Sequence, residues 1–409
     1  MLDKYFESPF TLKQLRSGPS APWLDSFAQY LHEDGYAWWT ARTYLRAAYH
    51  LSHVLKIKGV DLVAVQPDIV VEFRQHLKRC RCPKPRGGRT EDTVRGAEAF
   101  LRYLCIAGVI AQIAKPSWPP LVAGFRHWLN CHRGVSESTV CRYGAAAVEL
   151  VGKLGDDPDQ YDAERIRSFL LNRARRRGAG GTRAILSAVR LFLRYLATQK
   201  KCSPGLDAAV PAIAGWRLAS LPSCLSVDEV ETLVAACDLR LAMGLRDRAI
   251  ILLLARLGLR ASDVAALRFT HIDWGEGSII VTGKSRRESR LPLPQEVGDA
   301  ILAYLEHRPR VADEHVFLRS VAPFRALPAS SVSQVVRRAM RRTGVIAPTY
   351  GSHILRHTAA TEMLRNGVSL YDIGSVLRHR SADMSAYYAK VDMELLKQVV
   401  QPWPEVLSC

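Results

Sequence analysis

The chain has 409 residues, too many for one compact core, so we expect two or three domains. Its apolar fraction of 48% is ordinary for a folded protein, and its strongest apolar run, residues 249–255, is too short to span a bilayer. The net charge of +18 favours a polyanionic partner, because each basic residue that neutralises a phosphate releases counterions. We therefore expect contact with nucleic acid and not with a membrane.

The N-terminus and the cysteines both indicate a cytoplasmic, nucleoid-associated protein. The first residues lack the basic start and apolar core of a secretion signal. Nine scattered cysteines suit reduced thiols in a reducing compartment. Cys80 with Cys82, and His127 with Cys131 and His132, lack a second ligand pair at zinc spacing. We interpret them as structural or incidental and expect no metal and no cofactor.

The first half of the chain contains an internal repeat of four blocks. The blocks at residues 23–27, 40–44, 70–73 and 100–104 recur in the same order at 124–128, 137–143, 166–169 and 192–196. The last block reads Phe-Leu-Arg-Tyr-Leu in both copies. Apolar residues at helical spacing predict about four amphipathic helices in each copy. Duplication explains this order better than coincidence between two helical bundles.

Proline-rich segments divide the chain into three predicted domains. One linker, Lys115-Pro-Ser-Trp-Pro-Pro120, and a second at residues 214–222 cannot continue a helix. We predict an N-terminal helical module at residues 1–115, a second helical module at 120–213, and a C-terminal domain with a tail at 222–402.

The second module carries a long run of positive charge. Residues 166–201 contain no acidic residue and ten arginines or lysines. Such a run repels itself without a partner, so a DNA-facing surface is favoured over a solvated face. The arginines and glycines at 175–181 are typical of a phosphate-contacting turn, and the helix at 182–198 is expected to lie along a groove. The arginines predicted to contact DNA here are Arg173, Arg175, Arg176, Arg177, Arg183 and Arg190.

The pattern changes after the second linker. Ser226 is predicted to cap a helix whose first turn is acidic. Residues 247–257 form a helix too apolar for a surface. Ser262 is predicted to cap the next helix, at 263–268.

A short basic hairpin follows these helices. Residues 278–281 and 289–293 are predicted strands, and Pro292 and Pro294 place the second strand at a sheet edge. Arg286 and Arg287 in the turn are expected to contact DNA. Everything after Gln295 is predicted to be helical, ending in an amphipathic stretch at 391–400.

The C-terminal domain also contains side chains suited to phosphodiester chemistry without a metal. A guanidinium fork binds two phosphate oxygens and keeps its proton, so arginine stabilises charge that develops in the transition state. A lysine or histidine can protonate the leaving oxygen, and a tyrosine hydroxyl becomes a nucleophile beside a base. The candidates are Arg260, Lys284, His353, Arg356, His379, and Tyr387 or Tyr388.

In this order and spacing, the candidates resemble the catalytic domain of the tyrosine recombinases, the phage-integrase family. The motifs are Gly258-Leu-Arg260, Gly283-Lys284, His353-Ile-Leu-Arg356, Leu377-Arg-His379 and Tyr388, nine residues beyond His379. The resemblance is close over residues 221–402 and looser over the second helical module. It implies a mainly α fold with a small antiparallel β-sheet, in which two SAM-like helical DNA-binding modules precede the catalytic domain.

The resemblance also implies roles for the residues. Tyr388 attacks a DNA phosphate to give a 3′-phosphotyrosine, and Arg260 and Arg356 bind the non-bridging oxygens. Lys284 protonates the leaving 5′ oxygen. His353 serves as base toward Tyr388, His379 supports the phosphate, and Asp263 braces the site.

Two positions require comment. Spacing favours Tyr388 as the nucleophile, and Tyr387 is interpreted as a packing neighbour. Where the family usually has glycine before the second histidine, this chain has Arg378, which adds charge and a side chain beside the site. This departure from the family pattern lies directly before His379.

The sequence therefore predicts a site-specific recombinase that integrates, excises or transposes a mobile element. A tetramer on two DNA sites is implied by the family, and other recombinases of the same element are possible partners. The C-terminal tail has two open interpretations, packing on its own domain or docking on a neighbour. Alternatives are a type IB topoisomerase, which uses a similar set of groups, and a catalytically silent DNA-binding regulator of the same fold.

Overall fold

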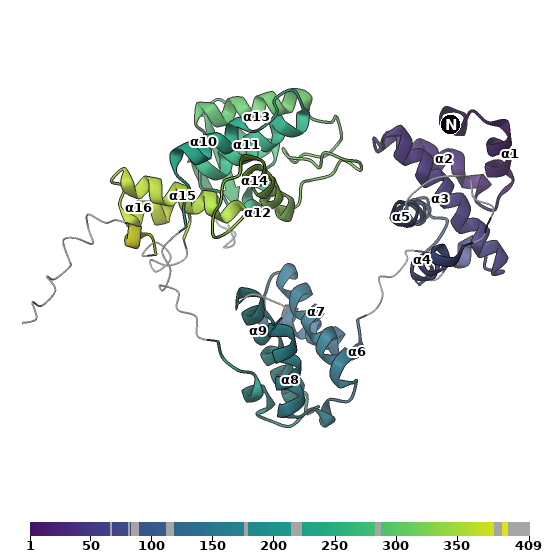
Figure 1. Ribbon diagram of the computed structural model, residues 1–409, viewed down its shortest axis with the longest axis horizontal. Coiled ribbons are helices and arrows are strands. Elements are labelled where there is room, and N and C mark those ends of the chain that lie inside the picture. The colour runs from purple at the N-terminus through teal and green to yellow at the C-terminus, as the bar shows by residue number, and fades with distance from the viewer. Residues whose placement is uncertain are drawn as a thin grey trace, which may run out of the picture. The chain divides into compact units, whose positions relative to one another are not determined.

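The computed structural model describes residues 1–65, 68–80, 82, 90–111, 118–175, 179–213, 223–282, 288–379 and 387–391. The described chain is mostly helical, with one small sheet (Figure 1). The predicted fold class, mainly α with a small antiparallel sheet, is confirmed. Within the described residues, no helix is both long and apolar enough to cross a membrane.

The first repeat copy folds into helices that carry the four blocks in order. Residues 23–27 lie on α2, 40–44 on α3, 70–73 on α4 and 100–104 on α5. The 3-10 helices η1 and η2 and the helix α1 add to this set. The bounds are η1 (Leu2–Lys4), α1 (Pro9–Ser17), α2 (Ala21–Glu33), α3 (Trp38–Ile57), η2 (Leu62–Ala64), α4 (Ile69–Arg79) and α5 (Thr90–Ile106).

The second copy places its blocks on four helices in the same order. Phe125 and Phe192 are fully buried, as are Leu24 and Phe100 at the matching positions of the first copy. Equivalent burial at equivalent block positions supports duplication. The bounds are α6 (Pro120–Arg133), α7 (Glu137–Leu154), η3 (Pro158–Gln160), α8 (Ala163–Ala174), α9 (Ala179–Thr198) and η4 (Leu206–Ala209).

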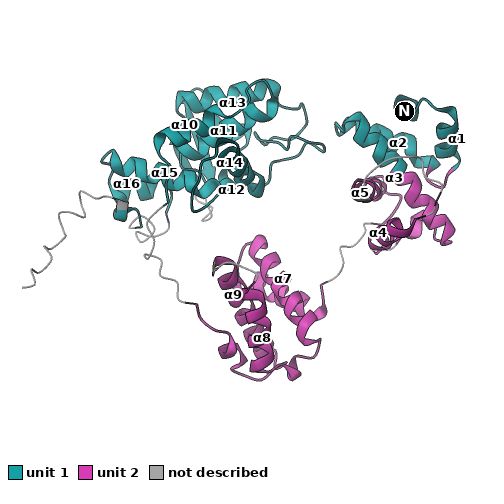
Figure 2. Cartoon of the chain, in the orientation of Figure 1, with its two compact units in different colours: residues 1–17, 21–46, 217–409 teal, residues 18–20, 47–216 magenta. Residues whose placement is uncertain are grey.

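The chain separates into two compact units, shown in Figure 2. One contains residues 1–17, 21–46 and 217–409, and the other contains 18–20 and 47–216. A hydrophobic core within the second unit is built only from residues between Val122 and Val210. This core lies inside the predicted 120–213 module. The three-domain division itself stays a prediction, because its linkers fall largely on residues outside those described.

The C-terminal domain packs around two buried helices, α11 and α15. Residues 249–254 of α11 are fully buried, as expected from their apolar sequence. Thr358 of α15 accepts a hydrogen bond from the Leu225 N–H at 2.9 Å, which ties α15 to the start of the domain. The helices are α10 (Val227–Ala235), α11 (Ala242–Arg256), α12 (Ala261–Ala265), η5 (Phe269–His271), α13 (Gln295–His307), α14 (Ala329–Thr343), α15 (Ser352–Arg365), α16 (Leu370–Val376) and η6 (Tyr388–Val391).

The predicted hairpin is present, and its second strand lies at a sheet edge. Strands β1 (Ile272–Asp273), β2 (Ser278–Thr282) and β3 (Glu288–Pro292) form an antiparallel sheet in the order β1-β2-β3. Thr282 pairs with Glu288, so the ends of the basic turn are held together. The turn itself, with Lys284, Arg286 and Arg287, lies outside the described residues.

One predicted cap is confirmed and another is wrong. Ser226 accepts from the Glu229 N–H and Glu229 accepts from the Ser226 N–H, a reciprocal capping box. Ser262 does not cap a helix at 263–268, because α12 already begins at Ala261. The carboxylate of Asp263 accepts from the Arg260 N–H there instead, at 3.2 Å.

The prediction of helix throughout the region after Gln295 is also wrong between α13 and α14. Residues 308–328 are irregular. The Arg308 side chain donates hydrogen bonds to main-chain carbonyls in this segment, including those of His315 and Val316. These side-chain bonds satisfy carbonyls that a helix would have paired within itself.

Candidate active site

The site begins at a tight turn after α11. Gly258 has a φ of +57°, and a Cβ there would lie 2.5 Å from the Leu377 side chain. Only glycine adopts this conformation and allows this approach without a steric cost. The Gly258 carbonyl accepts a hydrogen bond from Arg356, so the turn places one of the site's hydrogen-bond acceptors.

Two arginines from different elements converge on the end of α16. Arg260 donates to the Arg378 carbonyl at 2.9 Å. Arg356, in α15 and only 5% exposed, donates to the carbonyls of Gly258 and Leu377. Neutral carbonyls fix the two guanidinium groups without cancelling their charge.

Tyr388 lies beside these arginines and is almost fully buried. Its ring packs in a small core with Leu364, Ile373 and Leu377. Its hydroxyl oxygen lies 2.9 Å from Nδ1 of His357, within hydrogen-bond distance. Burial raises the pKa of the hydroxyl, and the positive charge of Arg356 opposes that rise. The hydroxyl is therefore protonated near neutral pH and needs a base before it can attack.

Two histidines flank the tyrosine ring. His379 stacks on it with ring centroids 6.0 Å apart and an interplanar angle of 7°. Burial, then the charges of Arg356 and Arg260, lower the pKa of His379 to about 4. Burial, then His353 and Arg356, lower the pKa of His357 to about 4. Both rings are neutral near pH 7, so both can accept a proton.

Burial also affects the pKa of one arginine in the site. The pKa of Arg356 is lowered to about 10, first by burial and then by the nearby charge of Arg260. Arg356 remains charged at neutral pH. Burial is the largest cause of these depressed pKa values, and neighbouring positive charge adds to it, an effect that a bound anion would oppose.

Arg378 occupies a backbone position that favours glycine. Its φ is +56°, in the left-handed region. The Arg378 N–H donates to Ser375 and the His379 N–H donates to Gly374, the bond pattern of a Schellman cap that ends α16. The cap gives a physical reason for glycine at this position.

The side chain of Arg378 forms a buried ion pair. Its Nη2 lies 2.6 Å from an Asp263 carboxylate oxygen, and the two side chains are 9% and 3% exposed. The Nε and Nη1 atoms of Arg378 are buried without a hydrogen-bond partner among the described residues. Asp263 therefore holds both the Arg260 main chain and the Arg378 side chain in place.

Comparison with known proteins identifies the family. Residues 223–394 match the model described as the phage integrase family. The putative integrase/recombinase y4rA of Sinorhizobium fredii is 37% identical over 98% of this chain and 99% of its own length. The chain belongs to the phage integrase family.

Two further matches are consistent with this membership. The tyrosine recombinase XerD of Listeria monocytogenes is 27% identical over 68% of this chain and 96% of its own length. A solved lambda integrase tetramer bound to a Holliday junction matches with a TM-score of 0.53 and 17% identity. It covers 76% of this chain and 89% of that chain, and shows that the fold is shared.

The structure brings four of the six family motif residues together, namely Arg260, Arg356, His379 and Tyr388. His353 lies in the first turn of α15, is exposed, and influences the pKa of His357 one turn away. Lys284 lies outside the described residues. The stacking of His379 on Tyr388 shows that Arg378 does not displace the histidine from the site.

His357 is the residue that sequence reasoning missed. The motif ends at Arg356, so the next residue received no role. The sequence did indicate that His357 lies near His353, because residues four apart share one helix face and His357 follows His353 by four. What sequence could not supply is the contact with a tyrosine 31 positions away.

The arginines predicted to contact DNA differ in their surroundings. Arg173 forms an ion pair with Glu149, and Arg190 donates to the carbonyls of Val210 and Pro211. Arg175 and Arg183 are exposed. Arg176 and Arg177 lie outside the described residues. A DNA-contacting role for these arginines stays a prediction.

We expect Arg378→Gly to be more stable than Arg378→Ala by about 1 kcal/mol, because only the glycine relieves the left-handed backbone. Both variants lose the ion pair with Asp263 and should fall below wild type. Chemical denaturation measures the three free energies of unfolding. Equal stability of the two variants would contradict the proposed backbone strain.

We also expect acid sensitivity from His357 and His379. Their folded pKa values of about 4 lie below the unfolded value of roughly 6.5, so the unfolded chain binds more protons in that window. The free energy of unfolding should therefore fall as pH drops from 6.5 toward 4. The slope per histidine should stay below about 1.4 kcal/mol per pH unit, because each ring can differ by at most one bound proton between the two states.

His357→Gln provides the comparison for this pH effect. The variant lacks one of the two titrating groups, so its free energy of unfolding should depend less steeply on pH between 6.5 and 4.5. Carboxylates also titrate near the lower limit, and they do so equally in both proteins. Parallel curves for wild type and His357→Gln would contradict the depressed pKa of His357.

Proposed function

We propose that this chain is a site-specific DNA recombinase that cleaves and rejoins duplex DNA through a 3′-phosphotyrosine at Tyr388. Membership in the phage integrase family supports the reaction class. The observation that supports the assignment is the buried Tyr388 hydroxyl, within hydrogen-bond distance of His357 and close to two arginines that donate to main-chain carbonyls. Integration, excision or transposition of a mobile element is the corresponding biological setting.

The proposed reaction exchanges one phosphoester bond for another and so conserves the bond energy. The Tyr388 oxygen forms a bond to phosphorus while the bond from phosphorus to the 5′ oxygen breaks. Arg260 and Arg356 bind the non-bridging oxygens, where the transition state gathers negative charge. The tyrosine proton passes to a neutral histidine, and the leaving 5′ oxygen takes a proton from Lys284. Attack by a 5′ hydroxyl on the phosphotyrosine reverses each step and reseals the strand.

The base toward Tyr388 has two candidates on one helix face. His353 is the candidate that the family motif supplies. His357 is the one that lies 2.9 Å from the hydroxyl oxygen. We propose His357 as the immediate proton acceptor and retain His353 as a group beside it. Phosphate binding would raise the pKa of His357, because its negative charge offsets Arg356, which adds to the effect of burial in lowering that pKa.

Arg378 extends the proposed site. Its Nε and Nη1 groups are buried and without a partner among the described residues, while Nη2 binds Asp263. A buried donor without a partner costs free energy that an anionic oxygen would recover. We propose that Arg378 is a third arginine facing the DNA phosphate.

The oligomeric state and the DNA contacts of this chain are also proposals. A tetramer of lambda integrase has been solved on a Holliday junction, and we propose that this chain also acts as a tetramer on two DNA sites. Arg173, Arg175, Arg176, Arg177, Arg183, Arg190, Arg286 and Arg287 are proposed DNA contacts. Residues 392–402 of the tail lie outside those described.

A covalent-complex assay tests the nucleophile. The substrate is a duplex selected from random sequence by binding to the full chain, then nicked near each candidate exchange position so that cleavage traps the enzyme. Wild type should form a denaturation-resistant adduct, and Tyr388→Phe should form none. Tyr387→Phe is the matched control and should retain the adduct.

The same assay separates the alternative functions. An adduct that persists in Tyr388→Phe would contradict the assignment. A wild-type chain that binds the duplex without any adduct would indicate a silent regulator. Relaxation of supercoiled plasmid lacking the selected sequence would favour a type IB topoisomerase.

A second substrate separates the base from the acid. Replacing the bridging 5′ oxygen by sulfur gives a leaving thiolate that needs no proton, because thiols are far more acidic than alcohols. Lys284→Ala should cleave the oxygen substrate roughly 10²-fold more slowly than wild type and recover on the sulfur substrate. His357→Ala should be slowed by a similar factor of about 10² on both substrates.

Single-turnover rates of adduct formation measure these effects. His353→Ala is the matched comparison for His357→Ala, since the two histidines lie one turn apart on α15. Recovery of His357→Ala on the sulfur substrate would assign His357 to the leaving group. A larger defect in His353→Ala than in His357→Ala would return the role of base to His353.

A further inference from the structure

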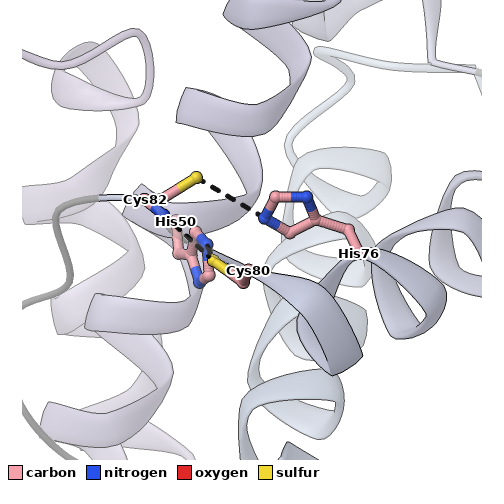
Figure 3. A group of neighbouring side chains, drawn as sticks. All are labelled: His50, His76, Cys80 and Cys82. Carbon is pink, nitrogen blue, oxygen red and sulfur yellow. Dashed lines mark hydrogen bonds between the residues drawn. The ribbon is translucent and has the colours of Figure 1, made fainter.

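Four potential metal ligands meet in the helical segment of residues 47–82, far along the sequence from the catalytic motifs. His50 lies on α3, and His76 lies in the last turn of α4. Cys80 is the C-cap of α4, and Cys82 follows two residues later. Figure 3 shows the four side chains pointing toward one another from these elements. All four belong to the same compact unit.

Their spacing suits a tetrahedral metal ion. The two sulfur and two ring nitrogen atoms all lie within 4.8 Å of one another. Sγ of Cys80 is 3.2 Å from Nε2 of His50, and Sγ of Cys82 is 3.5 Å from Nε2 of His76. A zinc tetrahedron with bonds of about 2.3 Å to sulfur and 2.0–2.1 Å to nitrogen separates its ligands by roughly 3.3 to 3.8 Å. The cluster needs little adjustment to reach that geometry.

The surroundings support a fixed site. His50 is buried, and the other three ligands are partly buried. Phe73 packs against both imidazole rings, with centroids 5.3 Å from His50 and 6.3 Å from His76. The Cys82 N–H lies 3.4 Å from the Cys80 sulfur, where it can donate a hydrogen bond that favours a thiolate. The C-terminus of α4 adds a partial negative charge that favours a cation.

The ligand set selects the kind of metal and its role. Two thiolates and two imidazoles in a tetrahedron are typical of structural Zn²⁺. Four protein ligands leave no position open for water or substrate, so the ion would not take part in hydrolysis or strand transfer. Two thiolates balance the charge of Zn²⁺, so neighbouring Lys78 and Arg79 do not oppose its binding.

We propose that His50, His76, Cys80 and Cys82 bind one structural Zn²⁺ in the N-terminal helical module. Binding releases the two thiol protons and links α3 to the end of α4. It also fixes the chain at Cys82, where the basic segment of residues 83–89 begins. The proposal differs from the expectation that Cys80 and Cys82 are structural or incidental and that the chain binds no metal. It does not rest on the proposed recombinase chemistry.

The four proposed ligands are spread along the sequence, so the two cysteines alone did not predict a metal site. The second pair consists of histidines from two helices, one of them 30 positions before Cys80. A local signal was present, because His76 and Cys80 are four apart at the end of α4. The fourth ligand, His50, is identified only by the packing of α3 against this end.

Metal analysis of the full chain tests the proposal. Protein expressed with zinc and purified without chelator should contain about one zinc per chain by elemental mass spectrometry. Cys80→Ser and His76→Ala should each lose most of this zinc and unfold at a lower temperature than wild type. Cobalt added to the chelator-treated chain should give the visible absorption bands of a tetrahedral thiolate site.

Cys131→Ser is the matched control. Cys131 also lies beside a histidine, with Sγ 3.5 Å from Nε2 of His127, but no further ligand joins this pair within the described chain. This variant should keep both zinc and stability. Zinc-free wild type, zinc retained by the Cys80→Ser, His76→Ala double variant, or a Cys80–Cys82 disulfide would overturn the proposal. None of these readouts depends on DNA cleavage.

Discussion

The carbonyl groups of Leu377 and Arg378 hold the guanidinium groups of the site. Arg356 donates to the first and Arg260 to the second, so the two residues that follow α16 set the positions of two arginines that come from other elements. Because the acceptors are neutral, the positive charge remains available to a ligand. Preorganised charge of this kind stabilises a transition state that gathers negative charge on phosphate oxygens.

That arrangement depends on the backbone conformation that ends α16. The left-handed residue Arg378 turns the chain so that His379 stacks on Tyr388. Gly258 allows the facing turn to approach Leu377. Burial and then the same arginines lower the pKa of His379, so its ring is neutral near pH 7. Backbone geometry, charge and proton transfer are thus coupled through a few peptide groups.

Features of the fold that depend on neighbouring residues in the sequence could be predicted from it. Apolar residues at 249–254 predicted a buried helix, and two prolines predicted an edge strand. Ser262 was predicted to cap a helix at 263–268, yet the helix starts one residue before it. A serine in a turn before a helix looks the same in the sequence whether or not it is the N-cap. Only the backbone conformation shows which residue caps the helix.

Contacts between distant segments could not be predicted in the same way. His357 meets Tyr388, and His50 meets Cys80, only after helices pack. The basic run at 166–201 appeared unopposed, but Glu149 and Asp207 from other segments pair with two of its arginines. Linear charge patterns do not show partners that folding supplies. Lys284, Arg286, Arg287 and the tail after 391 lie outside the described residues and stay predictions.

The most direct measurement locates the covalent bond to DNA. The trapped complex is digested with nuclease and trypsin, and the peptide SADMSAYYAK, residues 381–390, is fragmented in a mass spectrometer. Fragment ions that separate Tyr387 from Tyr388 identify the modified side chain. We predict a residual 3′-nucleotide on Tyr388 alone. A nucleotide on Tyr387, or on any residue outside this peptide, would contradict the proposed mechanism.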